Sequence, residues 1–194
     1  MNKDYRGTTP PGYVRIIGGS LRGSRLSVPA LPGLRPTPQR LRQTLFDWLA
    51  PVVAGAKVLD AFAGSGALGI EALSRGARDA TFIEHDNVQA RAIEADLARL
   101  HQGNAAVLRG DALRVLAQPA TGHFDIVFLD PPFDAGLWTQ SLALLDAGGW
   151  LAPQAWVYVE TGNDDAWEVP AGWLLHRQRD AGAVRGTLYR VVAA

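Results

Sequence analysis

The sequence contains no cysteine, which excludes disulfide bonds, thiolate zinc sites and cysteine nucleophiles. Its four histidines are scattered along the chain, so nothing in the sequence suggests a metal site. No apolar run approaches the ~20 residues that a membrane-spanning helix needs, and the N-terminus lacks the apolar stretch of a secretory signal. We therefore expect a cytoplasmic protein, a monomer, with neither a metal nor a membrane as its partner.

Lysine is nearly absent too, with only Lys3 and Lys57, so arginine carries most of the positive charge. The formal net charge is zero, but the charge is unevenly distributed. Residues 1–45 hold eight basic residues and one acidic residue, a net of +7, which leaves −7 for the other residues. A general preference for arginine does not explain why positive charge gathers at one end. This distribution indicates a polyanionic partner that binds the N-terminal arm.

The chain length favours one main domain with a small appendage. Residues 15–28 predict two short strands around a glycine-rich turn, and a helix is expected after Thr37 as N-cap with Pro38 as its first residue. From Lys57 onward, apolar strands alternate with helices, which predicts a mostly parallel α/β sheet covered on both faces. Expected strands are residues 57–61, 80–84, 105–109, 126–129, 156–160, 174–179 and 187–192. We divide the chain into a basic hairpin arm, residues 1–37, and a main domain, residues 38–194.

A glycine-rich turn follows the first of these strands. Gly64, Gly66 and Gly69 have the spacing GxGxxG, and Glu84 ends the next strand 20 residues after Gly64. The spacing alone also fits a dinucleotide-binding fingerprint, in which the glycines admit a pyrophosphate. Asp60 separates the two possibilities, because a carboxylate at the strand end would repel phosphates.

The same carboxylate suits the ammonium and sulfonium groups of S-adenosylmethionine. Glu84 could accept hydrogen bonds from ribose hydroxyls, and Asp111, with the amide of Ala112 nearby, could accept one from the adenine amino group. These acids are expected in one crevice at the carboxyl edge of the sheet. The competing interpretations are a dehydrogenase-like fold, or a strand-end aspartate that only caps the next helix.

A second motif, Asp130-Pro131-Pro132-Phe133, follows a buried strand directly. Two prolines leave no backbone N–H, so the Asp130 and Pro131 carbonyls could face the crevice as acceptors. Together with the Asp130 carboxylate they could accept both hydrogens of an exocyclic amino group and orient its nitrogen lone pair. Phe133 offers a face for stacking a base that has left its helix. The alternative is an ordinary turn, since Asp-Pro pairs favour turns.

These motifs together resemble class I methyltransferases that act on amino nitrogens. The finer resemblance is to the RsmD family, the bacterial 16S rRNA guanine-N2 methyltransferases. It rests on RIIGG at residues 15–19, RG at 22–23, LRPT at 34–37, RLRQTLF at 40–46 and EALSRGA at 71–77. The likeness extends from about Arg15 to the C-terminus.

This resemblance implies a Rossmann-like sheet of seven strands with an antiparallel last strand, plus a small N-terminal hairpin. It implies S-adenosylmethionine as cofactor and 16S rRNA in the small ribosomal subunit as partner. The tetrad Asp130, Pro131, Pro132 and Phe133 would be catalytic. The expected cofactor-binding residues are Asp60, Phe62, Ala63, Gly64, Ser65, Gly66, Leu68, Glu84, His85, Asp111 and Ala112. The expected RNA-binding residues are Arg15, Arg22, Arg25, Arg35, Thr37, Arg40 and Arg42.

Three functions stay open on the sequence. The first is methylation of a guanine N2 amino group in rRNA. The second is the same chemistry on a DNA adenine, which the N-terminal signature disfavours, or on a protein glutamine, which the basic arm disfavours. The third is a non-catalytic RNA-binding protein of ribosome assembly, which would be expected to have lost Asp60 or Asp130.

Overall fold

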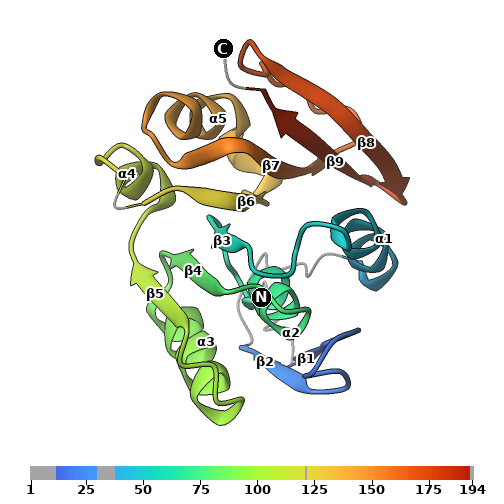
Figure 1. Ribbon diagram of the computed structural model, residues 1–194, viewed down its shortest axis with the longest axis vertical. Helices are drawn as coiled ribbons and strands as arrows, with labels where there is room; N and C mark the ends of the chain where they lie inside the picture. The colour runs from blue at the N-terminus through green and yellow to red at the C-terminus, as the bar shows by residue number, and fades with distance from the viewer. Residues whose placement is uncertain (1–11, 30–37, 121, 193–194) are drawn as a thin grey trace, which may run out of the picture.

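The computed structural model describes residues 12–29, 38–120 and 122–192, and its centre is a seven-stranded sheet with the order β5-β4-β3-β6-β7-β9-β8 (Figure 1). All pairings from β5 to β7 are parallel, and β9 alone runs against the others. The predicted fold class, including the antiparallel last strand, is confirmed. The strands are β3 (Lys57–Asp60), β4 (Asp79–Glu84), β5 (Ala105–Arg109), β6 (Phe124–Leu129), β7 (Leu151–Gly162), β8 (Trp173–Ala181) and β9 (Val184–Val191).

Helices cover both faces of the sheet because the central strands are apolar on both sides. One face packs against α1 (Gln39–Leu49), α2 (Ala67–Ser74) and α3 (Asn87–Arg99). The other packs against α4 (Ala112–Leu116) and α5 (Trp138–Ala147). A short 3-10 turn, η1 (Phe133–Ala135), precedes α5. No helix in the described ranges has the length and apolarity needed to span a bilayer.

Most element boundaries differ from the sequence prediction, and the starts of α1 and β7 have an identifiable cause. Pro38 is the N-cap of α1, and its carbonyl accepts hydrogen bonds from the N–H groups of Leu41 and Arg42. The helix therefore begins one residue later than expected, and Thr37 lies outside the described residues. Strand β7 begins at Leu151, although Pro153 and the positive φ of Gln154 interrupt the strand pattern that the sequence shows before Trp156. A register shift between Phe124 and Ile126 of β6 absorbs this irregular start.

The N-terminal hairpin, β1 (Gly12–Arg15) with β2 (Arg25–Val28), packs on α2 and α3 and shares their core. Val14, Ile16 and Leu26 are buried in it. The buried carboxylate of Glu71 on α2 fixes the chain that leaves β1. It accepts hydrogen bonds of 2.8 Å from the backbone N–H groups of Ile17 and Gly18, and a third of 2.8 Å from the Arg75 guanidinium.

We expect Glu71→Gln to lower the free energy of unfolding by about 2–4 kcal/mol, because the amide cannot accept all three hydrogen bonds and leaves Arg75 without its anion. The matched control is Glu94→Gln, which breaks an exposed ion pair with Arg109 and should cost about 0–1 kcal/mol. Urea unfolding of both variants measures the difference. Equal losses in the two variants would contradict the role assigned to Glu71.

Candidate active site

Four adjacent strands of the sheet have acidic residues at or near their carboxyl ends, at the same edge. Along the order β4-β3-β6-β7 these are Glu84, Asp60, Asp130 and Glu160. Asp60 pairs with Phe128, so Asp130 follows two residues beyond that pairing, and Leu129 pairs with Val159, so Asp130 and Glu160 come next on their strands. Parallel pairing thus brings acids that are up to 100 residues apart in sequence to one crevice edge.

The glycine-rich turn between β3 and α2 supplies the backbone donors for two of these acids. Gly64 and Gly66 have φ values of 53° and 72°, in the left-handed region that favours glycine. One oxygen of Glu84 accepts the Gly64 N–H at 2.7 Å and the other accepts the Asp86 N–H at 2.8 Å. Asp60 accepts the Gly69 N–H at 3.0 Å.

Gly69 is needed for close packing of α2 on the sheet, and not for an unusual backbone conformation. A Cβ on it would lie 2.3 Å from the ring of buried Phe82 on β4, so only glycine lets α2 approach the sheet this closely. The close approach keeps the Gly69 N–H within reach of Asp60.

Asp60 is 2% exposed, and its burial raises its pKa to about 7. The hydrogen bond from Gly69 opposes this shift, and the charge of Glu84 adds to it. When burial raises the pKa of a carboxyl group in this way, a cationic ligand beside it stabilises the ionised form. The crevice therefore suits a ligand with a positive group near Asp60, and a phosphate in that place would be repelled.

The other predicted cofactor-binding residues lie around the same turn or at its rim. Ala63, Ser65, Leu68 and Ala112 are buried, and Phe62 is half-buried. His85 has a largely exposed side chain, with Nδ1 3.2 Å from Glu84. Asp111 follows β5 and caps α4 by accepting the Arg114 N–H at 2.9 Å, as the capping interpretation expected. This bond uses one carboxylate oxygen of Asp111.

The Asp-Pro-Pro-Phe tetrad lies where β6 ends. Pro131 is buried, while Pro132 and Phe133 are exposed. The Pro132 carbonyl accepts the Ala135 N–H and closes η1. In the described part of the chain, the Pro131 carbonyl receives no hydrogen bond. The Phe133 ring is 38% exposed and lies 6.1 Å from the ring of Trp138.

Glu160 is a site residue that was not predicted from the sequence. It is 2% exposed, next to Asp130 at the end of β7, and it accepts a hydrogen bond of 3.1 Å from the Tyr158 hydroxyl. Burial, and then the charge of Glu160, raise the pKa of Tyr158 far above its ordinary value. Glu160 also ends a predicted strand, so the rule that singled out Asp60 and Glu84 could have found it.

Among the residues predicted to bind RNA, Arg42 has a different environment from the others. Its side chain is 2% exposed, and it donates to the Arg15 carbonyl at 3.1 Å. Burial lowers its pKa, opposed by the charges of Glu71 and Glu160. Its predicted contact with RNA is therefore wrong for this conformation, and Arg42 joins α1 to the hairpin instead. The prediction missed this because helix periodicity left Arg42 largely off the apolar face.

The remaining predicted RNA-binding arginines in the described ranges are exposed: Arg15, Arg22, Arg25 and Arg40. Arg15 and Arg25 are opposite each other in the hairpin register, and both guanidinium groups lie over the exposed ring of Tyr13, at 5.8 Å and 4.6 Å. Like charges directly opposite each other in a strand pair are destabilising. An anionic partner bound to both guanidinium groups would offset this repulsion. Arg35 and Thr37 lie outside the described residues.

The sheet order, the glycine turn and the acidic edge define a class I methyltransferase. The chain belongs to the family described as conserved hypothetical protein 95, whose model matches residues 14–190, and the resemblance to the RsmD family is confirmed.

The chain is similar over nearly its whole length to named relatives. It is 52% identical to the ribosomal RNA small subunit methyltransferase D of Escherichia coli K12, over 92% of this chain and 90% of that protein. It is 44% identical to the protein of the same name from Haemophilus influenzae, over 92% and 94%. The solved structure of the yhhF protein of Escherichia coli matches with a TM-score of 0.85 at 50% identity, over 94% of this chain and 100% of that one.

The raised pKa of Asp60 predicts a pH dependence of stability. The folded protein holds the Asp60 proton more tightly than the unfolded chain, whose carboxyl titrates near 3.8. Its contribution to stability is therefore complete below pH 4 and is lost as the pH rises to about 7. We expect Asp60→Asn to gain stability relative to the parent protein across this window. Urea unfolding at several pH values measures the difference, and parallel curves for the two proteins would contradict the assignment.

Proposed function

We propose that this protein methylates the exocyclic N2 amino group of one guanine in 16S rRNA of the small ribosomal subunit, using S-adenosylmethionine. The observation that carries the proposal is the Asp130–Phe133 tetrad at the end of β6, directly beside the acidic crevice of Asp60 and Glu84. The names of the 52% and 44% identical relatives support an rRNA substrate.

The residues present fit S-adenosylmethionine as the cofactor. Asp60 would hold its ammonium group, Glu84 its ribose hydroxyls and Asp111 its adenine amino group. Each Glu84 oxygen already accepts one backbone N–H, and a carboxylate oxygen can accept a second hydrogen bond. Gly64 and Gly66 give the turn its left-handed backbone, and a Cβ on Gly66 would lie 3.2 Å from the side chain of Ile93. When bound, the cofactor supplies an electrophilic methyl group on a sulfonium.

The tetrad would position the nucleophile. The lone pair of a guanine amino nitrogen is delocalised into the ring, so this nitrogen is a poor nucleophile. The Asp130 carboxylate would accept one N–H and the Pro131 carbonyl the other, which localises the lone pair and directs it at the methyl group. Phe133, exposed beside Trp138, would stack on the flipped base. Most of the catalytic effect in this scheme is positioning.

The basic arm, residues 1–37, would hold the RNA, while residues 38–194 carry the reaction. Arg15, Arg22 and Arg25 place exposed positive charge on the hairpin, and Tyr13 adds an exposed ring between two of them. Arg40 at the start of α1, together with Arg35 and Thr37, would border the target pocket. Because Val14, Ile16 and Leu26 belong to the shared core, this arm is a rigid surface in its described part.

We expect Asp130→Ala to reduce methyl transfer by at least about 10³-fold, because the amino nitrogen loses its acceptor in the transition state. Affinity for S-adenosylmethionine should stay within a few fold. The assay is transfer of labelled methyl to small ribosomal subunits that lack base methylation, followed by nucleoside analysis for N2-methylguanosine. Turnover at the parental rate would refute the role of Asp130, and a different methylated nucleoside from the parent protein would refute the choice of guanine.

Cofactor affinity should rise with pH up to about 7, because the cofactor ammonium pairs only with ionised Asp60. Calorimetric titration between pH 5.5 and 7.5 should show proton release on binding at the acidic end of this range. Asp60→Asn should bind more weakly and with a flatter pH profile. If the variant keeps the parental pH profile, the cofactor does not pair with Asp60.

A further inference from the structure

A groove of about 400 Å³ lies between α1 and the hairpin formed by β8 and β9. Its lining is Pro38, Arg40, Leu41 and Thr44 from the start of α1, and residues 179–182 from the turn of the hairpin. The two walls come from segments some 140 residues apart in sequence, and the tertiary packing of α1 against β8 and β9 brings them together. Among the predicted site residues that the structure describes, only Arg40 borders this groove.

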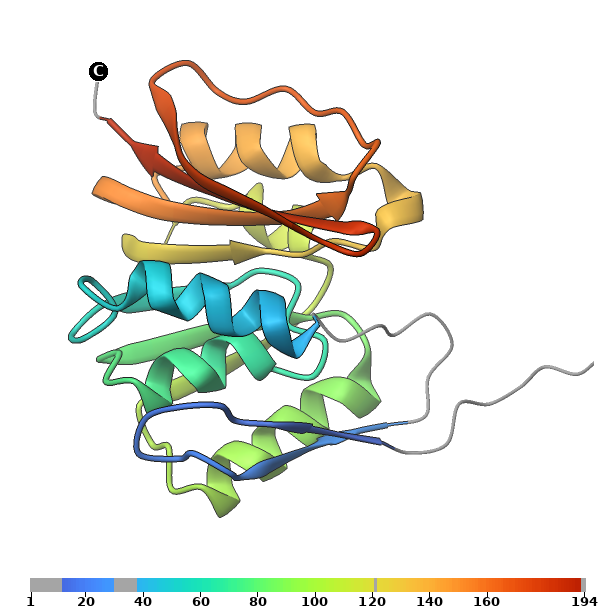
Figure 2. The ribbon, with the colours of Figure 1, turned by 90° about the vertical axis from the view of Figure 1, so that its right-hand side faces the viewer.

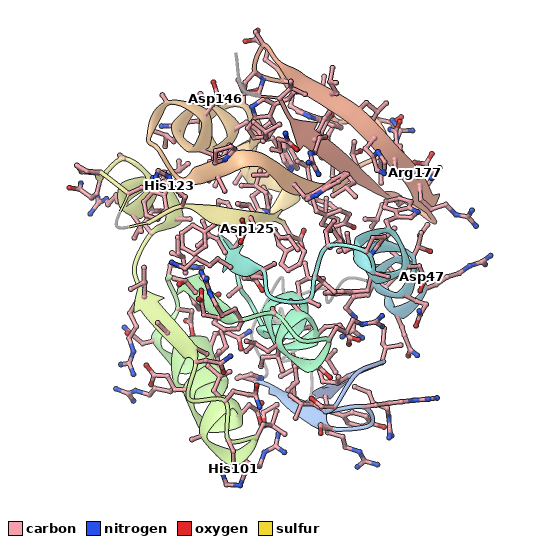
Figure 3. The ribbon with its side chains drawn as sticks, in the orientation of Figure 1. Asp47, His101, His123, Asp125, Asp146 and Arg177 are labelled. Atoms are coloured by element: carbon pink, nitrogen blue, oxygen red, sulfur yellow. The ribbon has the colours of Figure 1, made fainter. Side chains whose placement is uncertain are left out.

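Strand pairing places two arginines of β8 on the face of the sheet that α1 covers. Arg177 pairs with Leu188 and Arg179 with Gly186, and residues directly opposite in a strand pair point to the same face. A Cβ on Gly186 would lie 3.0 Å from Leu41 of α1, so this is the α1 face. In Figure 3, Arg177 is labelled on β8 on the side of α1, the helix that carries Asp47.

The positive charge of this groove is not compensated within the described structure. Arg40 and Arg179 line the groove, and Arg177 precedes Arg179 by two residues on the same face of β8. All three are exposed, and in the described ranges none of them forms an ion pair. Asp180 also lines the groove, but both of its oxygens are engaged by Arg185, at 2.8 Å and 3.0 Å. Asp47 on α1 accepts a hydrogen bond from Gln43, and the charge of Asp164 acts on Arg185. Three exposed guanidinium groups thus remain for an external anion.

The groove lies at the same edge of the sheet as the candidate active site. Gly162 at the end of β7 pairs with Val184, so the β8–β9 turn is at the same edge of the sheet as Glu160 and the tetrad. Figure 2 shows the N-terminal hairpin, α1 and the β8–β9 hairpin along one side of the molecule, with α1 between the other two. A strand of nucleic acid held by the N-terminal hairpin could therefore continue over α1 into the groove.

We propose that the groove between α1 and the β8–β9 hairpin binds the phosphate backbone of the substrate RNA, through Arg40, Arg177 and Arg179. This inference rests on the rRNA substrate of the proposed function and adds a second contact to the N-terminal hairpin. Arginine suits this task because its planar guanidinium can donate two parallel hydrogen bonds to one phosphate. Two separate contacts flanking the pocket would fix the register of the RNA while the target base leaves its helix.

The test compares two double variants that each remove two exposed positive charges, Arg177→Gln with Arg179→Gln, and Arg91→Gln with Arg114→Gln on α3 and α4 as control. Binding to undermethylated small ribosomal subunits and to free 16S rRNA is measured over a range of salt concentrations. For the groove variant, which carries Arg177→Gln and Arg179→Gln, we expect about tenfold weaker binding. The slope of log affinity against log salt should be smaller by about 1.4–1.8, which corresponds to the loss of two phosphate contacts. Arg40→Gln alone should reduce the slope by about half as much, because it removes one phosphate contact instead of two.

Two further readouts separate this inference from the proposed function. Cofactor affinity and thermal unfolding should be unchanged in the groove variant, whereas its KM for RNA should rise. RNA affinity and salt slope equal to those of the control variant would overturn the groove assignment. If the parent protein binds the RNA with the predicted salt slopes but transfers no methyl group to it, the proposed reaction fails and the groove assignment stands.

Discussion

Carboxylates at the buried edge of the sheet carry a desolvation cost in free energy, and the rest of the structure is arranged to offset it. Glu84, Asp60, Asp130 and Glu160 lie at or near the carboxyl ends of four adjacent strands. Ionised carboxylates taken out of water are stable only when donors or cations surround them. The glycine turn supplies backbone N–H groups to Glu84 and Asp60, and the Tyr158 hydroxyl donates to Glu160. Even so, the pKa of Asp60 rises to about 7, so this edge favours a cationic ligand.

The same physics explains how the N-terminal hairpin is attached. Glu71 is a fully buried carboxylate on α2, and the backbone of Ile17 and Gly18 together with Arg75 satisfies it. Arg42 then connects the hairpin to α1 and lies in the field of both Glu71 and Glu160. The hairpin and the acidic edge are therefore linked through α1 and α2, and a displaced hairpin would disturb the electrostatics beside the tetrad.

Periodicity and turn chemistry were sufficient to predict most of the fold, because buried parallel strands and capped helices are local patterns. Residues 105–109 have the predicted bounds, the glycine turn and Glu84 were found by spacing, and the tetrad was found by its residue types after a buried strand. The sequence could not show which arginines are exposed. Arg40 and Arg42 are two residues apart, yet one borders a groove and the other is buried, a difference that only the packing of α1 against the hairpin decides. Glu160 ends a predicted strand and could have been found by the rule that singled out Asp60 and Glu84, whereas its place beside Asp130 comes from the lateral pairing of β7 with β6.

The fold places the exposed arginines on the surface and the acidic residues inside the crevice. The two opposite charges can therefore act on different parts of one ligand. A negative crevice repels phosphates, so a nucleic acid would not enter it as a strand. Exposed arginines on the hairpin, α1 and β8 can hold phosphates outside the crevice, on one side of the molecule (Figure 2). A single uncharged base is then the only part of the nucleic acid that the acidic edge admits without electrostatic penalty. Under the proposed function, the net charge of +7 on residues 1–45 would attract the polyanion, and the acidic edge would admit from it only an uncharged base.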